Sequence, residues 1–449
     1  MFKVAWDIES GGILLSNDIL EPIVPPRPVF FEELDLLGFD KYWEYSRVQE
    51  PLLWSIGRKY YYKGQLVAEA KGGNIFEAPK ITISEKSKNI SLEPINLQLM
   101  LDKNRYALEV LENEAIDFIN DTYQRYKGKV DHFIVSYSGG KDSQVILDLV
   151  SRALPPDEYI VLFTDTTMEI PPTYDAYYQT KKYYQSLYPN LIFYVARNEQ
   201  HSYDLWKVFG PPSRIIRWCC SVYKTSPQVR LLRALTPDKP NFKILVFDGV
   251  RADESARRSG YKRITEGVKH NIQINAEIIK HWNVAEVFNY IFYRELIVNQ
   301  GYRFGLNRIG CSVCPFGSNW SEFIVFNVYK EFTTEYFNIL FDYVKNLSIS
   351  DNNEIKKYLI EGNWKKRAGS YGINSQFLNN TRIDFIDDNP NLECIISNTN
   401  SYVKIEWLKI FEQINKKNIH NCLVGEIKIK NKSINFKIQN LNKGKVKIN

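Results

Sequence analysis

Short apolar runs of strand length alternate with helical patterns through the middle of this chain. The runs are His132–Tyr137, Tyr159–Thr164, Leu191–Ala196 and Lys243–Asp248, and helical patterns lie between them. Parallel strands need long crossover connections, usually helical, so this alternation is typical of a largely parallel sheet covered by helices on both faces. We therefore predict an α/β fold with a doubly wound sheet. In such folds, ligands bind beyond the carboxyl ends of the strands.

The length of the chain predicts more than one domain, because 449 residues exceed the size at which a single hydrophobic core stops growing. Before the sheet we expect a β-rich part with a hairpin turn at Lys63-Gly64, followed by a helix over Arg105–Tyr126. After the sheet we expect helices at Asn319–Tyr329 and Tyr336–Leu347, and a short antiparallel β element from Asn421 onward. The predicted domains are residues 1–100 (β-rich), 101–320 (central), 321–390 (helical extension) and 391–449 (basic).

From its sequence, we expect this chain to lack signals for export or membrane insertion. Its start, MFKVAWDIES, lacks the basic and apolar stretches of a secretory signal, and no uninterrupted apolar segment has membrane-spanning length. Six cysteines in a chain this long are too few for a disulfide scaffold. We therefore expect a cytoplasmic protein that does not contact a membrane.

Positive charge is concentrated near the end of the chain. Residues 401–449 contain eleven lysines and three glutamates, a local charge of +8, whereas the whole chain has a formal charge of +6. A basic segment of this kind can bind DNA, RNA or another polyanion. It is equally compatible with a solvated face, so charge alone does not decide between the two.

A glycine-rich turn follows the first central strand and precedes a helical pattern. Its residues are Ser138, Gly139, Gly140, Lys141, Asp142 and Ser143. Two glycines allow backbone N–H groups to converge on a phosphate at the start of a helix, where free donors and the helix dipole favour an anion. We expect Lys141 to face that phosphate from a surface-accessible turn. A purely structural turn would show the same glycines, and the spacing is not that of a Walker loop.

The complete turn resembles the PP-loop of the ATP pyrophosphatase superfamily, whose members grip the pyrophosphate of ATP while its α-phosphate is attacked. Residues 163–173 and 249–258 resemble strand ends of the phosphoadenylyl-sulfate (PAPS) reductase branch, and the resemblance covers about residues 130–320. It implies a PP-loop, adenine nucleotide alpha hydrolase-like domain. The implied catalytic residues are Lys141, Ser143, Asp165 and Arg251, and the implied nucleotide-binding residues are Ser138, Gly139, Gly140, Asp142, Lys224 and Arg257.

Within this resemblance, Asp165 would bind the nucleotide or its metal and Arg251 would bind phosphate. An arginine suits a phosphate because its planar fork donates two parallel hydrogen bonds at full charge. The residues themselves also permit a plainer interpretation, in which Asp165 caps a helix and residues 251–258 form a solvated helix face.

Four cysteines occur in two close pairs, Cys219-Cys220 and Cys311-Ser312-Val313-Cys314. Four thiolates in two pairs can wrap a tetrahedral metal ion or a cubane cluster. Adjacent cysteines are unusual in zinc ribbons, and the pattern resembles that of adenylyl-sulfate reductases with a four-iron four-sulfur (4Fe-4S) cluster. We therefore predict such a cluster on Cys219, Cys220, Cys311 and Cys314, with zinc or ordinary buried thiols as the alternatives. Cys394 and Cys422 are interpreted as ordinary cysteines.

Two departures separate the chain from assimilatory sulfonucleotide reductases. Their turn usually lacks a lysine like Lys141, because a sulfonucleotide has no β,γ-pyrophosphate. Their nucleophilic cysteine lies in a Glu-Cys-Gly-x-His segment, whereas Glu393-Cys394-Ile395-Ile396 has no following histidine.

We therefore predict an ATP-cleaving, adenylylating PP-loop enzyme in sulfur transfer or nucleic-acid modification, similar to the adenylating component of DNA phosphorothioation systems. It would use ATP and the cluster, with Mg²⁺ and a sulfur-donor protein as further expected partners. One alternative is a PAPS or adenylyl-sulfate reductase of sulfate assimilation, which acts on a sulfonucleotide. The other is a non-catalytic nucleotide sensor or nucleic-acid-binding accessory protein.

Overall fold

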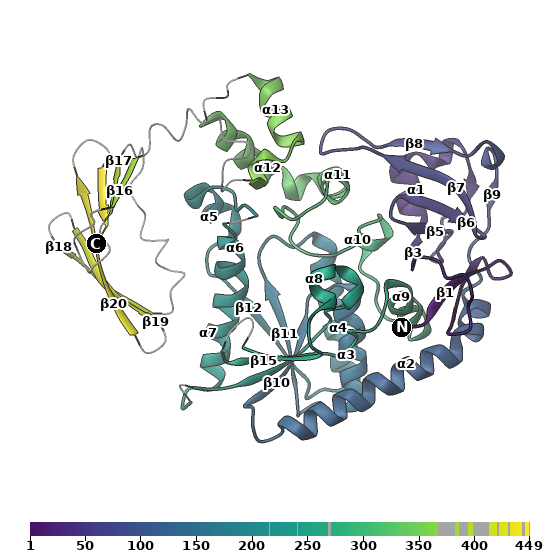
Figure 1. The fold of residues 1–449 in the computed structure, drawn as a ribbon, viewed down its shortest axis with the longest axis horizontal. Helices are drawn as coiled ribbons and strands as arrows, with labels where there is room; N and C mark the ends of the chain where they lie inside the picture. The colour runs from purple at the N-terminus through teal and green to yellow at the C-terminus, as the bar shows by residue number, and fades with distance from the viewer. Residues whose placement is uncertain are drawn as a thin grey trace. The chain divides into compact units, whose positions relative to one another are not determined.

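The computed structural model describes residues 1–366 except for 215, 240, 268–270, 348 and 350. Beyond residue 366 it describes only the backbone of six strands, and the side chain of Arg257 also lies outside the described part. Figure 1 shows the arrangement of the elements. Within the described part, no helix is long and apolar enough to cross a membrane.

A six-stranded sheet lies at the centre of the chain and confirms the predicted α/β fold (Figure 1). β10 (His132–Tyr137) pairs in parallel with β11 (Ile160–Asp165) on one side and with β13 (Ile244–Asp248) on the other. Beyond these, β12 (Ile192–Arg197) forms one edge, and β15 (Gln273–Glu277) and the antiparallel β14 (Ile264–Glu266) form the other. Successive strands lie first on one side of β10 and then on the opposite side, so the end of β10 is a topological switch point.

Helices cover both faces of this sheet, as a doubly wound fold requires. On one face, the sheet shares a core with helices α2 (Leu97–Tyr126), α3 (Lys141–Ala153), α4 (Pro171–Leu187) and α9 (Val284–Tyr293). On the other face, strand residues pack against the last turn of α7 (Ser226–Leu235). Both faces are therefore apolar, which explains why the central strands have continuous apolar sequences.

Helix α2 begins eight residues before the predicted start at Arg105, so that predicted boundary is wrong. Its N-cap is Asn96, whose side chain accepts a hydrogen bond from the Leu99 N–H. Asn104 interrupts the apolar pattern because it is buried and bonded to β2 (Gly12–Ser16), accepting from the Leu15 N–H at 2.7 Å. The buried polar side chain of Asn104 interrupts the apolar periodicity, so the sequence pattern did not predict the first two turns of α2.

The N-terminal region is rich in short strands, as predicted. Its five-stranded antiparallel sheet has the order β3 (Arg27–Val29), β5 (Leu53–Ile56), β6 (Lys59–Tyr62), β7 (Gln65–Lys71) and β8 (Lys80–Ile83). The predicted hairpin turn joins β6 to β7, with positive φ at Lys63 (45°) and Gly64 (81°). The remaining elements are β1 (Lys3–Asp7) paired with β2, β4 (Glu44–Tyr45) paired with β9 (Ser91–Leu92), helix α1 (Phe31–Leu37), and 3₁₀ turns η1 (Phe39–Lys41) and η2 (Glu85–Ser87).

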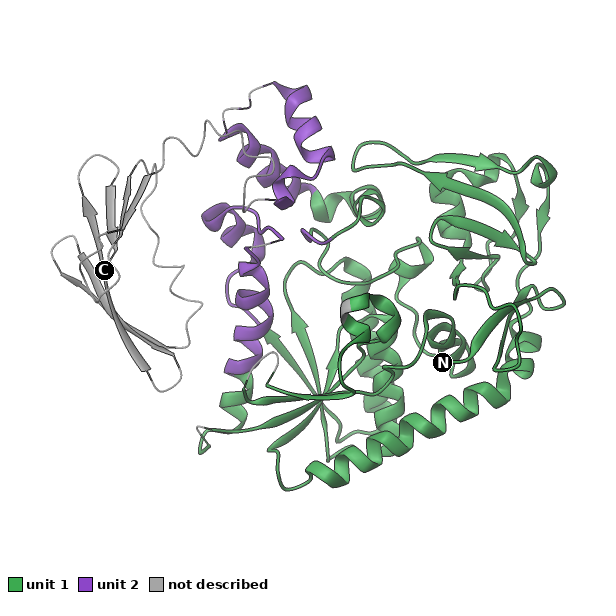
Figure 2. Cartoon of the chain, in the orientation of Figure 1, with its two compact units in different colours: residues 1–196, 231–313, 317–333 green, residues 197–230, 314–316, 334–449 purple. Residues whose placement is uncertain are grey.

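The chain divides into two compact units (Figure 2). Unit 1 contains residues 1–196, 231–313 and 317–333, and unit 2 contains residues 197–230, 314–316 and 334–449. Unit 1 therefore holds the N-terminal strands, the central sheet and helix α11 (Asn319–Val328), which matches a predicted helix. The four predicted domain boundaries stay a prediction.

Up to residue 366, unit 2 is helical and has an aromatic core. Trp206 packs against Tyr336 with ring centroids 5.2 Å apart, and Trp364 lies 6.3 Å from Trp206. The elements are α5 (Ser202–Phe209), α6 (Trp218–Cys220), the π-helical η3 (Ser221–Thr225), the first half of α7, most of α12 (Lys330–Lys345), α13 (Asn352–Ile360) and η5 (Asn363–Lys366). Near the end of the chain, antiparallel pairing of β19 (Cys422–Ile429), β20 (Lys432–Leu441) and β21 (Lys445–Ile448) confirms the β element predicted from Asn421 onward. The same sheet also contains β16 (Arg382–Phe385), β17 (Cys394–Ser397) and β18 (Gln413–Ile419), which were not predicted.

Candidate nucleotide site

The glycine turn connects β10 to α3, and hydrogen bonds between a side chain of the turn and its own backbone stabilise it. Gly139 has a φ of 70°, which favours glycine, and a Cβ there would lie 2.8 Å from Cγ2 of Thr173. Ser143 Oγ accepts a hydrogen bond from the Ser138 N–H at 3.1 Å and donates one to the Gly140 carbonyl at 2.9 Å. The turn thus places the first residues of α3 at the carboxyl end of the sheet, where a helix N-terminus attracts anions.

A cleft of about 200 Å³ opens at this turn. Ser138, Gly140, Asp142 and Ser143, all predicted from the sequence, line this cleft together. The other lining residues come from β10, from the end of β13 and the segment after it, and from residues 302–309. They are Ser136, Asp248, Gly249, Val250, Glu254, Arg258, Tyr302, Arg308 and Ile309. The cleft therefore lies at the switch point of the sheet, where doubly wound folds bind their ligands.

Asp142 forms ion pairs with Lys141 and Arg251, the two side chains that were predicted to contact phosphate. Lys141 Nζ lies 2.9 Å from one carboxylate oxygen of Asp142, and Arg251 Nε lies 2.7 Å from the other. Burial by itself would raise the pKa of Asp142, but the charges of Lys141 and Arg251 outweigh it and lower that pKa below its usual value. This cluster therefore holds its carboxylate ionised beneath the glycine turn.

The turn itself reaches the cleft, as predicted, but the side chain of Lys141 is buried beneath it and only 2% exposed. Besides its contact with Asp142, the ammonium group lies 5.3 Å from the centre of the Tyr302 ring, which covers it. Neither Lys141 nor Arg251 is among the residues that line the cleft. Their contact with phosphate stays a prediction.

Two other arginines, which the sequence analysis did not assign to phosphate, line the cleft. Arg258 on α8 (Ala256–Ser259) forms an ion pair with Glu254, whereas exposed Arg308 makes no ion pair within the described part of the chain. Burial lowers the pKa of Arg258 first, and the positive charge of Arg308 lowers it further. The two guanidinium groups therefore repel each other, and an anion bound beside both would relieve that repulsion.

Asp165 is the last residue of β11, and its side chain accepts hydrogen bonds that stabilise the loop after this strand. Its Oδ1 accepts hydrogen bonds from the Thr167 N–H at 2.7 Å and from the Tyr174 hydroxyl at 2.8 Å. These contacts hold Thr167 at a φ of 60°, a conformation that threonine rarely adopts. Asp165 does not cap α4, whose N-cap is Ile170, and it does not line the cleft, so its assignment to the nucleotide or its metal stays a prediction.

Cys219 and Cys220 form the end of α6, in unit 2. A hydrogen bond with Cys219 is the largest influence on exposed Cys220 and, together with the charges of Lys224 and Arg217, lowers its pKa to about 6 although burial opposes this. A low pKa favours the thiolate, which is the form that binds metals. Lys224, predicted to bind the nucleotide, thus contributes charge to this thiol, while the side chain of Arg257 lies outside the described residues.

The other predicted cysteine ligands fall in different units, Cys311 in unit 1 and Cys314 in unit 2. Cys311 pairs by an isolated β-bridge with Glu169, and its Sγ lies 3.7 Å from Glu169 Oε1. Among the described side chains, no group of three or more His, Cys, Asp or Glu residues is arranged to hold a metal ion. Four thiolates are the donor set that an iron–sulfur cluster takes, and the cluster on these cysteines stays a prediction.

A parallel sheet with a glycine turn at its switch point, and two guanidinium groups in the same cleft, define an α/β nucleotide-binding domain. Residues 132–316 match the model of the phosphoadenosine phosphosulfate reductase domain. The chain thus carries a domain of the PAPS reductase family, as its sequence motifs predicted.

Known relatives support this assignment. An uncharacterized protein of Methanocaldococcus jannaschii is 33% identical over 217 residues, which covers 48% of this chain and 42% of that protein, so the chain spans about two fifths of its length. The adenosine 5'-phosphosulfate reductase of Geobacillus kaustophilus is 28% identical over 205 residues, 44% of this chain and 78% of the reductase.

Among solved structures, a phosphoadenylyl-sulfate reductase from Candida auris, in a phosphate complex, is 20% identical and covers 48% of this chain and 95% of its own. The TM-score is 0.34, too low to add to the description of the fold. The finer resemblance to DNA phosphorothioation components stays a prediction.

Proposed function

We propose that this chain is an adenylylating enzyme that binds ATP at the glycine turn and releases pyrophosphate. The observation that carries the proposal is the cleft itself, in which the turn and the start of α3 lie together with Arg258 and Arg308. Backbone N–H groups and guanidinium groups would stabilise the negative charge that develops as pyrophosphate leaves. The acceptor would belong to sulfur transfer or nucleic-acid modification in the cytoplasm.

Lys141 supports ATP over a sulfonucleotide. Its ammonium group is paired with Asp142 at the first residue of α3, and a lysine in this turn is the feature that the PP-loop resemblance associates with ATP itself. Both carboxylate oxygens of Asp142 are paired with Lys141 and Arg251, so among the carboxylates of the cleft Asp248 is the better donor for Mg²⁺, which takes carboxylates together with substrate phosphates. Asp248 would hold the ion, which would neutralise phosphate charge.

A sulfonucleotide reductase is the second candidate, and the identity with the Geobacillus kaustophilus reductase favours it. Such an enzyme would use the same cleft to hold the sulfonucleotide. It would then need a nucleophilic thiol, which the sequence near Cys394 does not provide in the expected form.

Purification without oxygen, followed by two assays on one sample, tests both candidates. We expect pyrophosphate release from ATP and no thiol-dependent release of sulfite from adenylyl sulfate or PAPS. Sulfite release without pyrophosphate release would establish the reductase instead. If neither product forms, the chain is better described as a nucleotide-sensing or nucleic-acid-binding accessory protein.

A further inference from the structure

Tyr302 connects the nucleotide cleft to the start of α3. This residue lies on α10 (Gln300–Arg303), a helix of four residues, and its side chain lines the cleft although it is 3% exposed. Its hydroxyl accepts a hydrogen bond from the Lys141 N–H at 3.0 Å. The same oxygen lies 3.1 Å from the position that a Cβ would take at Gly140. The hydroxyl therefore bonds to Lys141 and leaves little room for a side chain at Gly140, the two residues at which the turn becomes a helix.

The hydrogen-bonding capacity of this hydroxyl is only partly used. A tyrosine hydroxyl can donate one hydrogen bond and accept two. The Lys141 N–H occupies one acceptor position, and among the described residues no acceptor takes the proton of Tyr302. A buried donor without a partner is costly, and a phosphate oxygen in the cleft would satisfy it.

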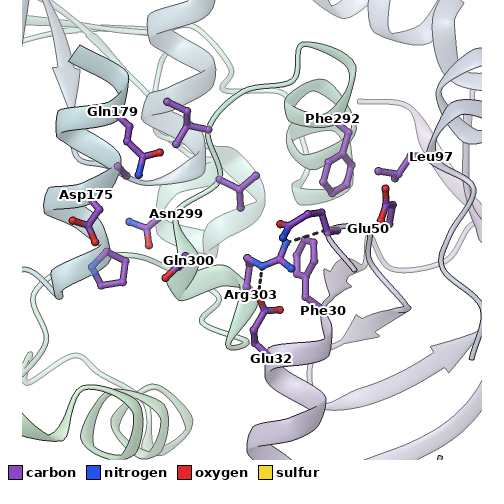
Figure 3. Close-up of a pocket in the computed structure, with 15 residues that line it drawn as sticks. Phe30, Glu32, Glu50, Leu97, Asp175, Gln179, Phe292, Asn299, Gln300 and Arg303 are labelled. Carbon is purple, nitrogen blue, oxygen red and sulfur yellow. Dashed lines mark hydrogen bonds and ion pairs between the residues drawn. The ribbon is translucent and has the colours of Figure 1, made fainter. Parts of the chain in front are cut away.

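Helix α10 is held in place on both sides of Tyr302. On one side, Asn299 Nδ2 donates to the Gly139 carbonyl at 3.0 Å, so α10 and the glycine turn are bonded directly. On the other side, Arg303 forms an ion pair with Glu32 at 2.5 Å and donates to the Gln49 carbonyl at 3.0 Å. Figure 3 shows Arg303, Glu32 and Asn299 at the wall of a separate cavity of about 440 Å³. Tyr302 is therefore a fixed part of the cleft.

We propose that the Tyr302 hydroxyl donates a hydrogen bond to a phosphate of the bound nucleotide. The Lys141 N–H fixes the oxygen, and the proton is left for an acceptor in the cleft. Tyr302 thus recognises the phosphate part of the ligand and contributes nothing to recognition of adenosine. This inference rests on the proposed nucleotide site and identifies a binding residue within it.

Tyr302→Phe removes the hydroxyl and preserves the ring over Lys141. We expect calorimetric titration to show that the Kd values of ATP and pyrophosphate rise about 10-fold or more, as for loss of a hydrogen bond to a charged group. The Kd of adenosine should change less than about twofold. Tyr184→Phe is a matched control, because Tyr184 is also buried and its hydroxyl contacts Asp148 outside the cleft.

Equal affinities of wild type and folded Tyr302→Phe for ATP and pyrophosphate overturn the inference, as does an equal loss for adenosine. If the variant does not fold, wild-type protein with ¹³C-labelled tyrosine rings provides the test, since Tyr302 is the one tyrosine among the residues lining the cleft. A tyrosine Cζ resonance that shifts with pyrophosphate and not with adenosine supports the contact, and no shift rejects it. Wild type that binds neither ATP nor pyrophosphate overturns the proposed function, and adenylyl sulfate then becomes the ligand for the same comparison.

Discussion

Asp142 is the residue on which the charge of the glycine turn depends. In Lys141→Ala the largely buried carboxylate of Asp142 keeps Arg251 as its one cationic partner among the described residues. We expect the free energy of unfolding to fall by about 1–3 kcal/mol and pyrophosphate release to fall about 100-fold. Urea denaturation and a pyrophosphate assay measure the two effects. Lys127→Ala, which removes an exposed lysine paired with Glu158, is the control, and undiminished release from folded Lys141→Ala would exclude the lysine from the site.

Arg308 differs from the other cations of the site because it is exposed and makes no ion pair with a described residue. Its removal should therefore weaken nucleotide binding without weakening the fold. For Arg308→Ala we expect a Kd for ATP that is about 10-fold higher and an unchanged unfolding midpoint. Arg308→Lys should recover only part of the affinity, because lysine retains the charge and loses the planar fork. An unchanged Kd in Arg308→Ala would show that the guanidinium group does not contact the ligand.

At the level of elements, the start of α9 predicts a dependence of stability on pH. Glu286 is fully buried, accepts hydrogen bonds from the Phe2 and Asn283 N–H groups, and burial raises its pKa to about 7. The folded chain therefore binds a proton more tightly than the unfolded chain, whose glutamates have pKa values of about 4.3. This contribution is complete below about pH 4 and is lost as pH rises through 7, by up to ~3 kcal/mol.

Urea denaturation at pH 5 and pH 8 measures this effect. The free energy of unfolding should be lower at pH 8 in wild type, and Glu286→Gln should flatten the difference because glutamine does not titrate. The same pH dependence in both proteins would assign it to other groups.

Elements that are long or buried on both faces were predictable from the sequence. The runs at β10, β11 and β13 match the strands closely, because strands covered on both faces have continuous apolar sequences. Helix α10 was not predictable, since four residues contain no periodic pattern. Its contact between Tyr302 and Lys141 joins positions 161 residues apart, and one sequence contains no signal for such a pairing.

The candidate site shows the same division. Ser138, Gly140, Asp142 and Ser143 were found because a glycine turn after a strand is a local pattern. The sequence also identified Lys141 and Arg251 but not their burial, because their shared contact with Asp142 appears only when residues 109 positions apart are folded together. The place of Arg308 in the cleft likewise depends on tertiary structure.

For the whole molecule, the four predicted cluster ligands make metal content a decisive measurement. Protein purified without oxygen should contain iron and acid-labile sulfide, and Cys311→Ser should lose both. Cys422→Ser is the control and should keep them, since Cys422 was interpreted as an ordinary cysteine. Stoichiometric zinc in colourless, active protein would support the zinc alternative.

The basic end of the chain predicts contact with a polyanion. Residues 401–449 carry the local charge of +8, and their side chains lie outside the described part of the structure. If this segment binds DNA or RNA, affinity should fall steeply as salt rises, because phosphate contacts release counterions. Gel-shift titrations at several salt concentrations should show a flatter dependence for a chain ending at Thr399. Identical binding by both chains, or none by either, would leave the lysines as a solubilising surface.

The contacts of Arg303 with Glu32 and with the Gln49 carbonyl set a lower limit on the length of a functional fragment of this chain. The segment that matches the family model begins at residue 132, yet Glu32 and the Gln49 carbonyl, which hold Arg303, come from the first fifty residues. A gene fragment for residues 132–316 would encode a buried guanidinium group without its counter-ion, at the end of the short helix that supports the glycine turn. The segment that matches the family model is therefore shorter than the segment that must be present in one polypeptide for the site to be supported.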